Sequence, residues 1–145
     1  MAIQFNKAPR KQFPVRKILV DCLRETATRF GKRIGQLDYI FVSDEALLEI
    51  NQEFLQHNFY TDIITFDLSE SPEILEANVY VSTDRVEENA REIGNGILEE
   101  YCRVLAHGLL HLCGLNDKTK AQSNLMRKAE DAFIALYLKK LTEVN

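Results

Sequence analysis

The sequence of 145 residues has few cysteines and no long apolar run. Its three cysteines, Cys22, Cys102 and Cys113, are odd in number and scattered, so they predict small buried hydrophobic residues rather than a disulfide framework. No apolar run approaches the ~18 residues of a transmembrane helix, and the N-terminus lacks a basic-then-apolar signal pattern. We therefore expect a protein of the cytoplasm that has no contact with the membrane.

An excess of positive charge is also missing. The chain has 18 Lys and Arg residues against 22 Asp and Glu residues, a net charge of −4. A protein that coats nucleic acid without specificity would be basic, so this balance argues against broad electrostatic binding. It still allows RNA to be held in a local basic groove, because affinity follows the phosphates that are actually contacted.

The remaining composition is that of an ordinary globular chain, with 46% hydrophobic and 28% charged residues. There is no repeat and no low-complexity segment, so residues 1–145 are expected to form a single domain. Hydrophobic periodicity predicts strands at 2–6, 36–43, from Ile63 onward and 78–82, and helices at 14–30, 44–54, 83–93, 97–113 and 121–141. Short strands between longer helices predict an α+β fold with a small mixed sheet of about four strands.

Two of the predicted helices have clear apolar stripes. The central one is expected to bury Leu98, Tyr101, Leu105, Leu109 and Leu112. In the last helix, the residues expected to face the core are Leu125, Ala129, Ala132, Phe133 and Leu136.

Two of only three histidines, His107 and His111, lie four residues apart in the central helix. This spacing places both imidazoles on one helical face, one turn apart. Gly114 can end the helix, because glycine enters the left-handed conformation without a Cβ penalty. The chain can then bring Asp117 back toward the two rings. Two nitrogen ligands and one oxygen ligand leave a fourth position open for water, as in catalytic zinc sites.

Other interpretations of this stretch exist. A histidine pair at helical spacing can be a core or surface histidine with a hydrogen-bonded neighbour. In zinc proteases of the His-Glu-x-x-His type, the residue after the first histidine is the general base. Here that residue is Gly108, which cannot accept a proton, so peptide hydrolysis by that mechanism is disfavoured. Cys113 points away from the histidine face and is not expected to bind metal.

The same stretch resembles the signature of the bacterial YbeY-type endoribonucleases, which are metal-dependent factors of ribosomal RNA maturation. Their usual pattern is His-Gly-x-Leu-His-Leu-x-Gly-Tyr-Asp-His. The residues that match it in place are His107, Gly108, Leu110, His111, Leu112 and Gly114. Leu115 and Asn116 replace the family's Tyr and Asp, and the third family histidine falls on Asp117. Since aspartate can also ligate zinc, the ligand set is altered but retained.

A second stretch, from Thr61 to Phe66, resembles the family's Pro-Thr-Asp-Val-Leu-Ser-Phe segment, with Tyr60 at the proline position. The family usually has an arginine six residues before this threonine, where this chain has Leu55. If that arginine binds phosphate, another cation must replace it, and the nearby His57 can do part of that work. The alternative is that His57 is a loop residue without a role. Thr61 and His57 are therefore candidate substrate-binding residues.

Further cations follow the motif. Lys118 and Lys120 come directly after Asp117 and are candidates for holding RNA phosphates near the metal. A solvated helix face is the alternative interpretation. Glu100 and Arg103, one to two turns before His107, are interpreted as a solvated salt pair, and the alternative is that they are partners of the metal ligands.

The resemblance implies a zinc-dependent endoribonuclease that acts in rRNA processing, rRNA maturation and ribosome quality control. His107 and His111 would be its catalytic residues and, with Asp117, would bind one zinc ion per chain. The implied partners are ribosomal RNA and the small ribosomal subunit, without DNA. Two alternatives stay open: a metallopeptidase of metzincin-like spacing, and a ribosome-associated binding protein whose zinc is structural.

Overall fold

The structure is a computed structural model that describes residues 2–144. Within this range it has four strands and five helices, an α+β architecture. The strands are β1 (Ala2–Asn6), β2 (Arg33–Val42), β3 (Ile63–Asp67) and β4 (Ile74–Ser82). The helices are α1 (Arg16–Arg29), α2 (Asp44–Leu55), α3 (Thr83–Ile93), α4 (Ile97–Leu112) and α5 (Lys120–Thr142).

The strands form one mixed sheet in the order β1-β2-β4-β3. Strand β2 pairs in parallel with β1 and with β4, whereas β3 pairs antiparallel with β4. Successive side chains of a strand point to opposite faces, so Leu37, Tyr39 and Phe41 of β2 share one face and are all buried. The predicted fold class, a small mixed sheet of four strands with packed helices, is confirmed.

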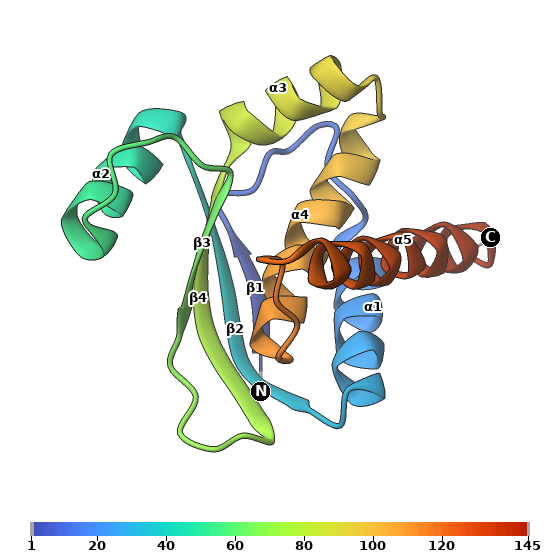
Figure 1. The fold of residues 1–145 in the computed structure, drawn as a ribbon. Coiled ribbons are helices and arrows are strands. Elements are labelled where there is room, and N and C mark those ends of the chain that lie inside the picture. The colour runs from blue at the N-terminus through green and yellow to red at the C-terminus, as the bar shows by residue number, and fades with distance from the viewer. Residues whose placement is uncertain (1, 145) are drawn as a thin grey trace.

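Helix α4 is the centre of the helical layer, as predicted. Helices α1, α4 and α5 lie on one side of the sheet, while α2 lies beside β3 and β4 on the other side (Figure 1). Ten of the 16 residues of α4 are buried, and the Tyr39 hydroxyl donates a hydrogen bond of 2.9 Å to the Leu105 carbonyl. The sheet and α4 are therefore joined by packing and by a buried hydrogen bond.

Gly108 allows α4 to approach the sheet closely. A Cβ atom at this position would lie 3.0 Å from Ile63 Cδ1 and 3.3 Å from Val79 Cγ1. A larger side chain would push α4 away from β3 and β4, because packed interiors have little room to adjust. The glycine that cannot act as a base thus has a structural role between the two histidines.

Two strands begin earlier than the sequence predicted, β2 at Arg33 and β4 at Ile74. The two extensions pair with each other across a bulge between Ile34 and Gln36. Gly35 sits at this bulge, where a Cβ atom would lie only 2.9 Å from Ile74 Cγ2. Glycine and charged residues weaken the strand pattern locally, and pairing with a neighbouring strand overrides that weak preference.

The predicted apolar stripes are wrong at two leucines. Leu98 of α4 is 40% exposed and Leu125 of α5 is 58% exposed. The buried residues of α5 are Met126, Glu130, Phe133, Ile134 and Tyr137. Ala132, also predicted to face inward, is exposed. A carboxylate occupies this inward stripe because it is paired with side chains of α4, which hydrophobicity alone does not reveal.

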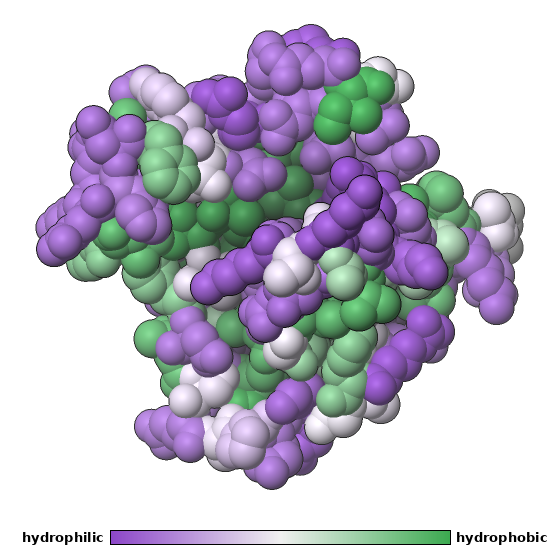
Figure 2. Space-filling model, in the orientation of Figure 1, coloured by the Kyte–Doolittle hydropathy of each residue, from purple (hydrophilic) through white to green (hydrophobic). Residues whose placement is uncertain are grey.

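No helix within residues 2–144 is both long and apolar enough to span a membrane. The cysteines are free thiols, with Cys22 and Cys102 buried as predicted and Cys113 partly buried. Viewed as in Figure 2, the surface is hollowed between the α2 end of the molecule and the start of α5, and hydrophobic residues form the floor of the hollow.

Candidate metal centre

The loop after α4 returns the chain toward the histidine face of that helix. Gly114 adopts a left-handed conformation with φ of 104°, and the Leu115 N–H donates to the Leu110 carbonyl at 3.0 Å. This is the helix ending for which glycine is preferred. Helix α5 then starts at a capping box formed by Thr119 and Gln122. The segment that contains Asp117 is therefore fixed at both ends.

Three side chains converge as the sequence predicted. The Nε2 atoms of His107 and His111 are 3.0 Å apart, and Asp117 Oδ2 lies 3.4 Å from the first and 3.6 Å from the second. Three donor atoms at 2.0–2.1 Å from one tetrahedral zinc ion would be about 3.3 Å apart. The three measured separations are close to that value, so the residues present fit a single metal ion.

The cluster is open to solvent on one side. The side chains of His111 and Asp117 are 32% and 42% exposed, and that of His107 is 24% exposed. An accessible three-ligand cluster is typical of catalytic metal sites, whereas structural zinc sites are closed by four protein ligands.

Glu130 of α5 holds the first histidine. Its Oε2 lies 2.7 Å from His107 Nδ1, and the carboxylate is almost fully buried. An ionised carboxylate only accepts hydrogen bonds, so Nδ1 is the protonated nitrogen and the Nε2 lone pair faces the cluster. Histidine ligands of metals are commonly oriented in this way by a carboxylate.

Arg103 completes this arrangement from α4. Its guanidinium donates to Glu130 at 3.0 Å and to Asp131 at 2.8 Å. The interpretation of Arg103 and Glu100 as a solvated salt pair is wrong, because Arg103 pairs with α5 and Glu100 is only 4% exposed. Arg103 fixes the carboxylate that in turn fixes His107.

The surroundings of His107 change its proton affinity. Burial lowers the pKa of His107, but the hydrogen bond with Glu130 and the charges of Glu130, Asp117 and Asp62 outweigh it and raise the pKa above 6.5. In the absence of metal, the ring is therefore protonated at a higher pH than an ordinary histidine.

Two cavities meet at the cluster. The first, of about 550 Å³, is lined by all three cluster residues and by the segment between α2 and β3, including His57, Phe59 and Thr61. The second, of about 340 Å³, lies toward α5 and is lined by His107 and Asp117 together with Arg127. Both volumes lie within the ~300–1,000 Å³ range of small-ligand sites.

The predicted substrate-binding residues divide into two groups. His57 and Thr61 line the first cavity beside the cluster, and so does Leu55, which stands where an arginine was expected. Lys118 and Lys120 are exposed and line neither cavity among the described residues. The first cavity is lined by no lysine or arginine within residues 2–144.

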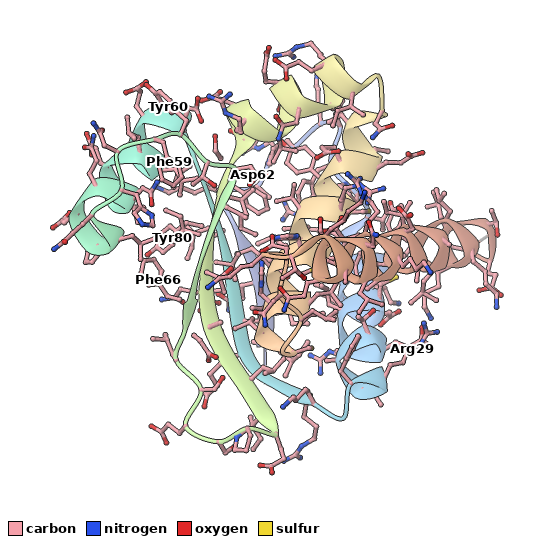
Figure 3. All side chains as sticks on the ribbon, in the orientation of Figure 1. Arg29, Phe59, Tyr60, Asp62, Phe66 and Tyr80 are labelled. Carbon is pink, nitrogen blue, oxygen red and sulfur yellow. The ribbon has the colours of Figure 1, made fainter. Side chains whose placement is uncertain are left out.

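Sequence reasoning missed or misinterpreted three carboxylates next to the cluster: Asp62 is partly buried, whereas Glu100 and Glu130 are buried. Asp62 lines both cavities, and Figure 3 shows it on the α4 side of the segment before β3. Glu100 lines the second cavity, and its Oε1 has no hydrogen-bond partner. Burial raises the pKa of both Asp62 and Glu100, so each has an increased tendency to hold a proton. The third is Glu130. It lies at helical spacing from Met126 and Tyr137, so the sequence already placed it on the buried face of α5, and that spacing could have revealed it.

The fold and the cluster together define a class of protein. They describe an α+β protein with an open site of two nitrogens and one oxygen, as in hydrolases that use a bound metal. The chain belongs to the endoribonuclease YbeY family: the family model described as "Endoribonuclease YbeY" matches residues 3–137.

Curated relatives with the name endoribonuclease YbeY cover nearly the whole chain. The relative from Cytophaga hutchinsonii is 50% identical over 132 residues, which are 91% of this chain and 92% of the relative. The one from Bacteroides thetaiotaomicron is 38% identical over 137 residues, 94% and 99% of the two chains. A solution structure of a Thermotoga maritima protein has a TM-score of 0.68 and 26% identity, and covers 98% of this chain and 93% of that one.

Proposed function

We propose that residues 1–145 form one domain that acts as a metal-dependent endoribonuclease on ribosomal RNA. The observation that supports it most directly is the convergence of His107, His111 and Asp117 at the wall of an open cavity, in a chain of the YbeY family. We further propose zinc as the metal, one ion per chain, because two imidazoles and one carboxylate suit it. Ribosomal RNA maturation and ribosome quality control would be the setting.

The chemistry needs a water that is deprotonated near neutral pH and a phosphate whose charge is stabilised. A zinc ion bound at the cluster would supply both effects. His107 and His111 would hold the ion through Nε2 and Asp117 through its carboxylate. Asp62 lies at the junction of the two cavities, and its raised pKa suits it to accept the proton that the water releases.

The RNA would lie across the cluster. Thr61 and His57 would contact it inside the first cavity, and Lys118 and Lys120 would contact phosphates at the exposed rim. The small ribosomal subunit is the proposed partner. Action in the cytoplasm, without DNA as a substrate, belongs to the same proposal.

The metallopeptidase alternative has less support. Gly108 occupies the position of the protease general base and has no titratable group. The side chains of Ile63 and Val79 pack closely against this position. The curated relatives are named as endoribonucleases. Incubation of the zinc-loaded protein with an unfolded protein substrate should therefore give no cleavage.

The proposal is tested by removing the cluster residues one at a time. His107→Ala, His111→Ala and Asp117→Ala should each lose both bound metal, measured by elemental analysis, and cleavage of ribosomal RNA. His57→Ala is the matched control, because His57 lines the same cavity but lies outside the cluster, so it should keep its metal. Loss of cleavage in His111→Ala with zinc fully retained would contradict the ligand assignment.

A further inference from the structure

An aromatic pair faces the cluster across the first cavity. The rings of His57 and Phe59 are stacked, with centroids 5.1 Å apart and planes 22° apart. Both side chains line the cavity that His107, His111 and Asp117 also line. Phe59 is 56% exposed, and Figure 3 shows it on the segment between α2 and β3.

The backbone of this segment is fixed. The His57 N–H donates to the Asn51 carbonyl at 3.1 Å, and the Asn51 side-chain amide donates to the Phe59 carbonyl at 2.8 Å. Asn51 is only 1% exposed, so it anchors the segment from within the fold. The backbone that carries the exposed phenyl ring is therefore held in place before any ligand arrives, which reduces the entropy cost of binding.

The charges in this cavity limit what can bind opposite the cluster. Three carboxylates line it, Asp62, Asp67 and Asp117, and none of its lining residues within 2–144 is lysine or arginine. A phosphate group placed away from the metal would meet negative charge and no fixed cation. A neutral planar ring suits the stacked pair better, and nucleobases are bound in this way when proteins hold RNA by stacking.

We propose that Phe59 and His57 form a stacking platform for a nucleobase of the RNA substrate, one that flanks the phosphate at the cluster. This inference rests on the proposed function, because it assumes that RNA occupies the cavity. Stacking needs no positive charge, so it supplies affinity in a cavity that has no lysine or arginine. It also positions the neighbouring phosphate at a fixed distance from the stacked base.

The test uses the zinc-loaded protein and an oligoadenylate with one abasic nucleotide at its centre. The wild-type protein should cleave the bond at a fixed offset from the abasic position about 5- to 150-fold more slowly than the other bonds, the range expected for loss of one stacked base. Phe59→Ala should cleave all bonds at this slower rate, without contrast between them. Phe59→Trp should restore the contrast.

Phe54→Ala is the matched control. Phe54 is an equally exposed ring of α2, 62% exposed, but it packs on Phe66 outside this cavity. It should leave both the rate and the contrast unchanged. Equal slowing of Phe59→Ala and Phe54→Ala, or an unchanged contrast in Phe59→Ala, would overturn the platform.

A binding measurement separates the platform from the nuclease activity. RNA with 2-aminopurine in place of one adenine should show fluorescence quenching when mixed with His111→Ala protein, and the quenching should vanish when Phe59→Ala is added to that variant. Quenching that depends on Phe59, together with a wild-type protein that cleaves no RNA, would support the platform and reject the proposed function. Quenching that does not depend on Phe59 would reject the platform.

Discussion

At the scale of single residues, His107 has a partner at each of its two ring nitrogens. Its Nδ1 faces the buried carboxylate of Glu130 and its Nε2 faces His111 and Asp117. Each ring nitrogen therefore has one role, hydrogen bonding or the proposed metal ligation. The tautomer that leaves Nε2 free is set by Glu130 rather than by the metal.

Glu130→Gln should weaken zinc binding by about 10- to 100-fold, because partners that orient a metal ligand typically have effects of that size. The amide keeps the shape of the carboxylate but can present its NH₂ group to Nδ1, which favours the wrong tautomer. Competition with a chromophoric chelator measures the affinity. Asp131→Asn, which alters only the exposed partner of Arg103, should bind zinc nearly as wild type does.

The raised pKa of His107 gives the pH dependence a definite sign. Metal binds the neutral ring, so zinc affinity should increase as pH rises from 6.5 and level off above the raised pKa. In the metal-free protein, the contribution of His107 to folding stability should instead decrease as pH rises. The stability that protonated His107 contributes is complete below 6.5 and is lost as pH rises through the folded-state pKa.

Urea denaturation of the metal-free protein across this range, for wild type and Glu130→Gln, tests the second trend. The variant lacks the main group that raises the pKa, so its stability should depend less on pH. An identical pH profile for the two proteins would show that Glu130 does not interact with the protonated ring in solution.

On the scale of secondary-structure elements, the end of α4 determines whether the cluster forms. The two histidines come from one helix, but Asp117 comes from the loop beyond it. The reversal at Gly114, with φ of 104°, is what brings that loop back. Residues other than glycine rarely adopt this backbone conformation.

Gly114→Ala should therefore lower the free energy of unfolding by about 1–2 kcal/mol, the cost of a Cβ in the left-handed region. It should also weaken zinc binding, because relief of the strain moves Asp117. Gly94→Ala is the matched control, since Gly94 ends α3 at φ of 81° with equally open surroundings. It should lose similar stability in urea and bind zinc normally. Unchanged zinc affinity in Gly114→Ala would show that the loop is fixed by the α5 capping box alone.

At the level of the whole molecule, the hydrophobic core is complete without the cluster. Buried side chains of the sheet, α1, α4 and α5 form one continuous set, and the cluster lies at its surface. Structural zinc sites, in contrast, hold together chains that lack such a core. The fold therefore should not depend on metal.

Chelation should abolish RNA cleavage while the far-UV circular dichroism and NMR dispersion stay native. Added zinc should restore cleavage and increase the free energy of unfolding by about 4 kcal/mol at a concentration 1,000 times the dissociation constant. Unfolding on chelation would instead favour the alternative in which zinc is structural.

Much of the fold was predictable from local pattern. Alternation of apolar and polar residues predicted β1 and β3. The helical spacing of apolar residues, together with glycines that end helices, predicted α1, α3 and α4 within a few residues. The early parts of β2 and β4 were not predictable, because Gly35 and Glu76 hide the alternation and only strand pairing holds them. Leu125 was misplaced because the inward stripe of α5 includes a carboxylate.

The sequence by itself determined which residues can hold a metal: two histidines one helical turn apart, a glycine that must end the helix and an aspartate beyond it. These depend on local geometry, which a few consecutive residues fix. Only the tertiary structure decided that Glu130 and Arg103 orient His107, and that the segment with Phe59 lies across the cavity from the cluster. Those contacts join residues from different elements, 23 to 28 positions apart in the case of the α4–α5 pairs. They exist only once packing on the sheet has set the distance between the elements.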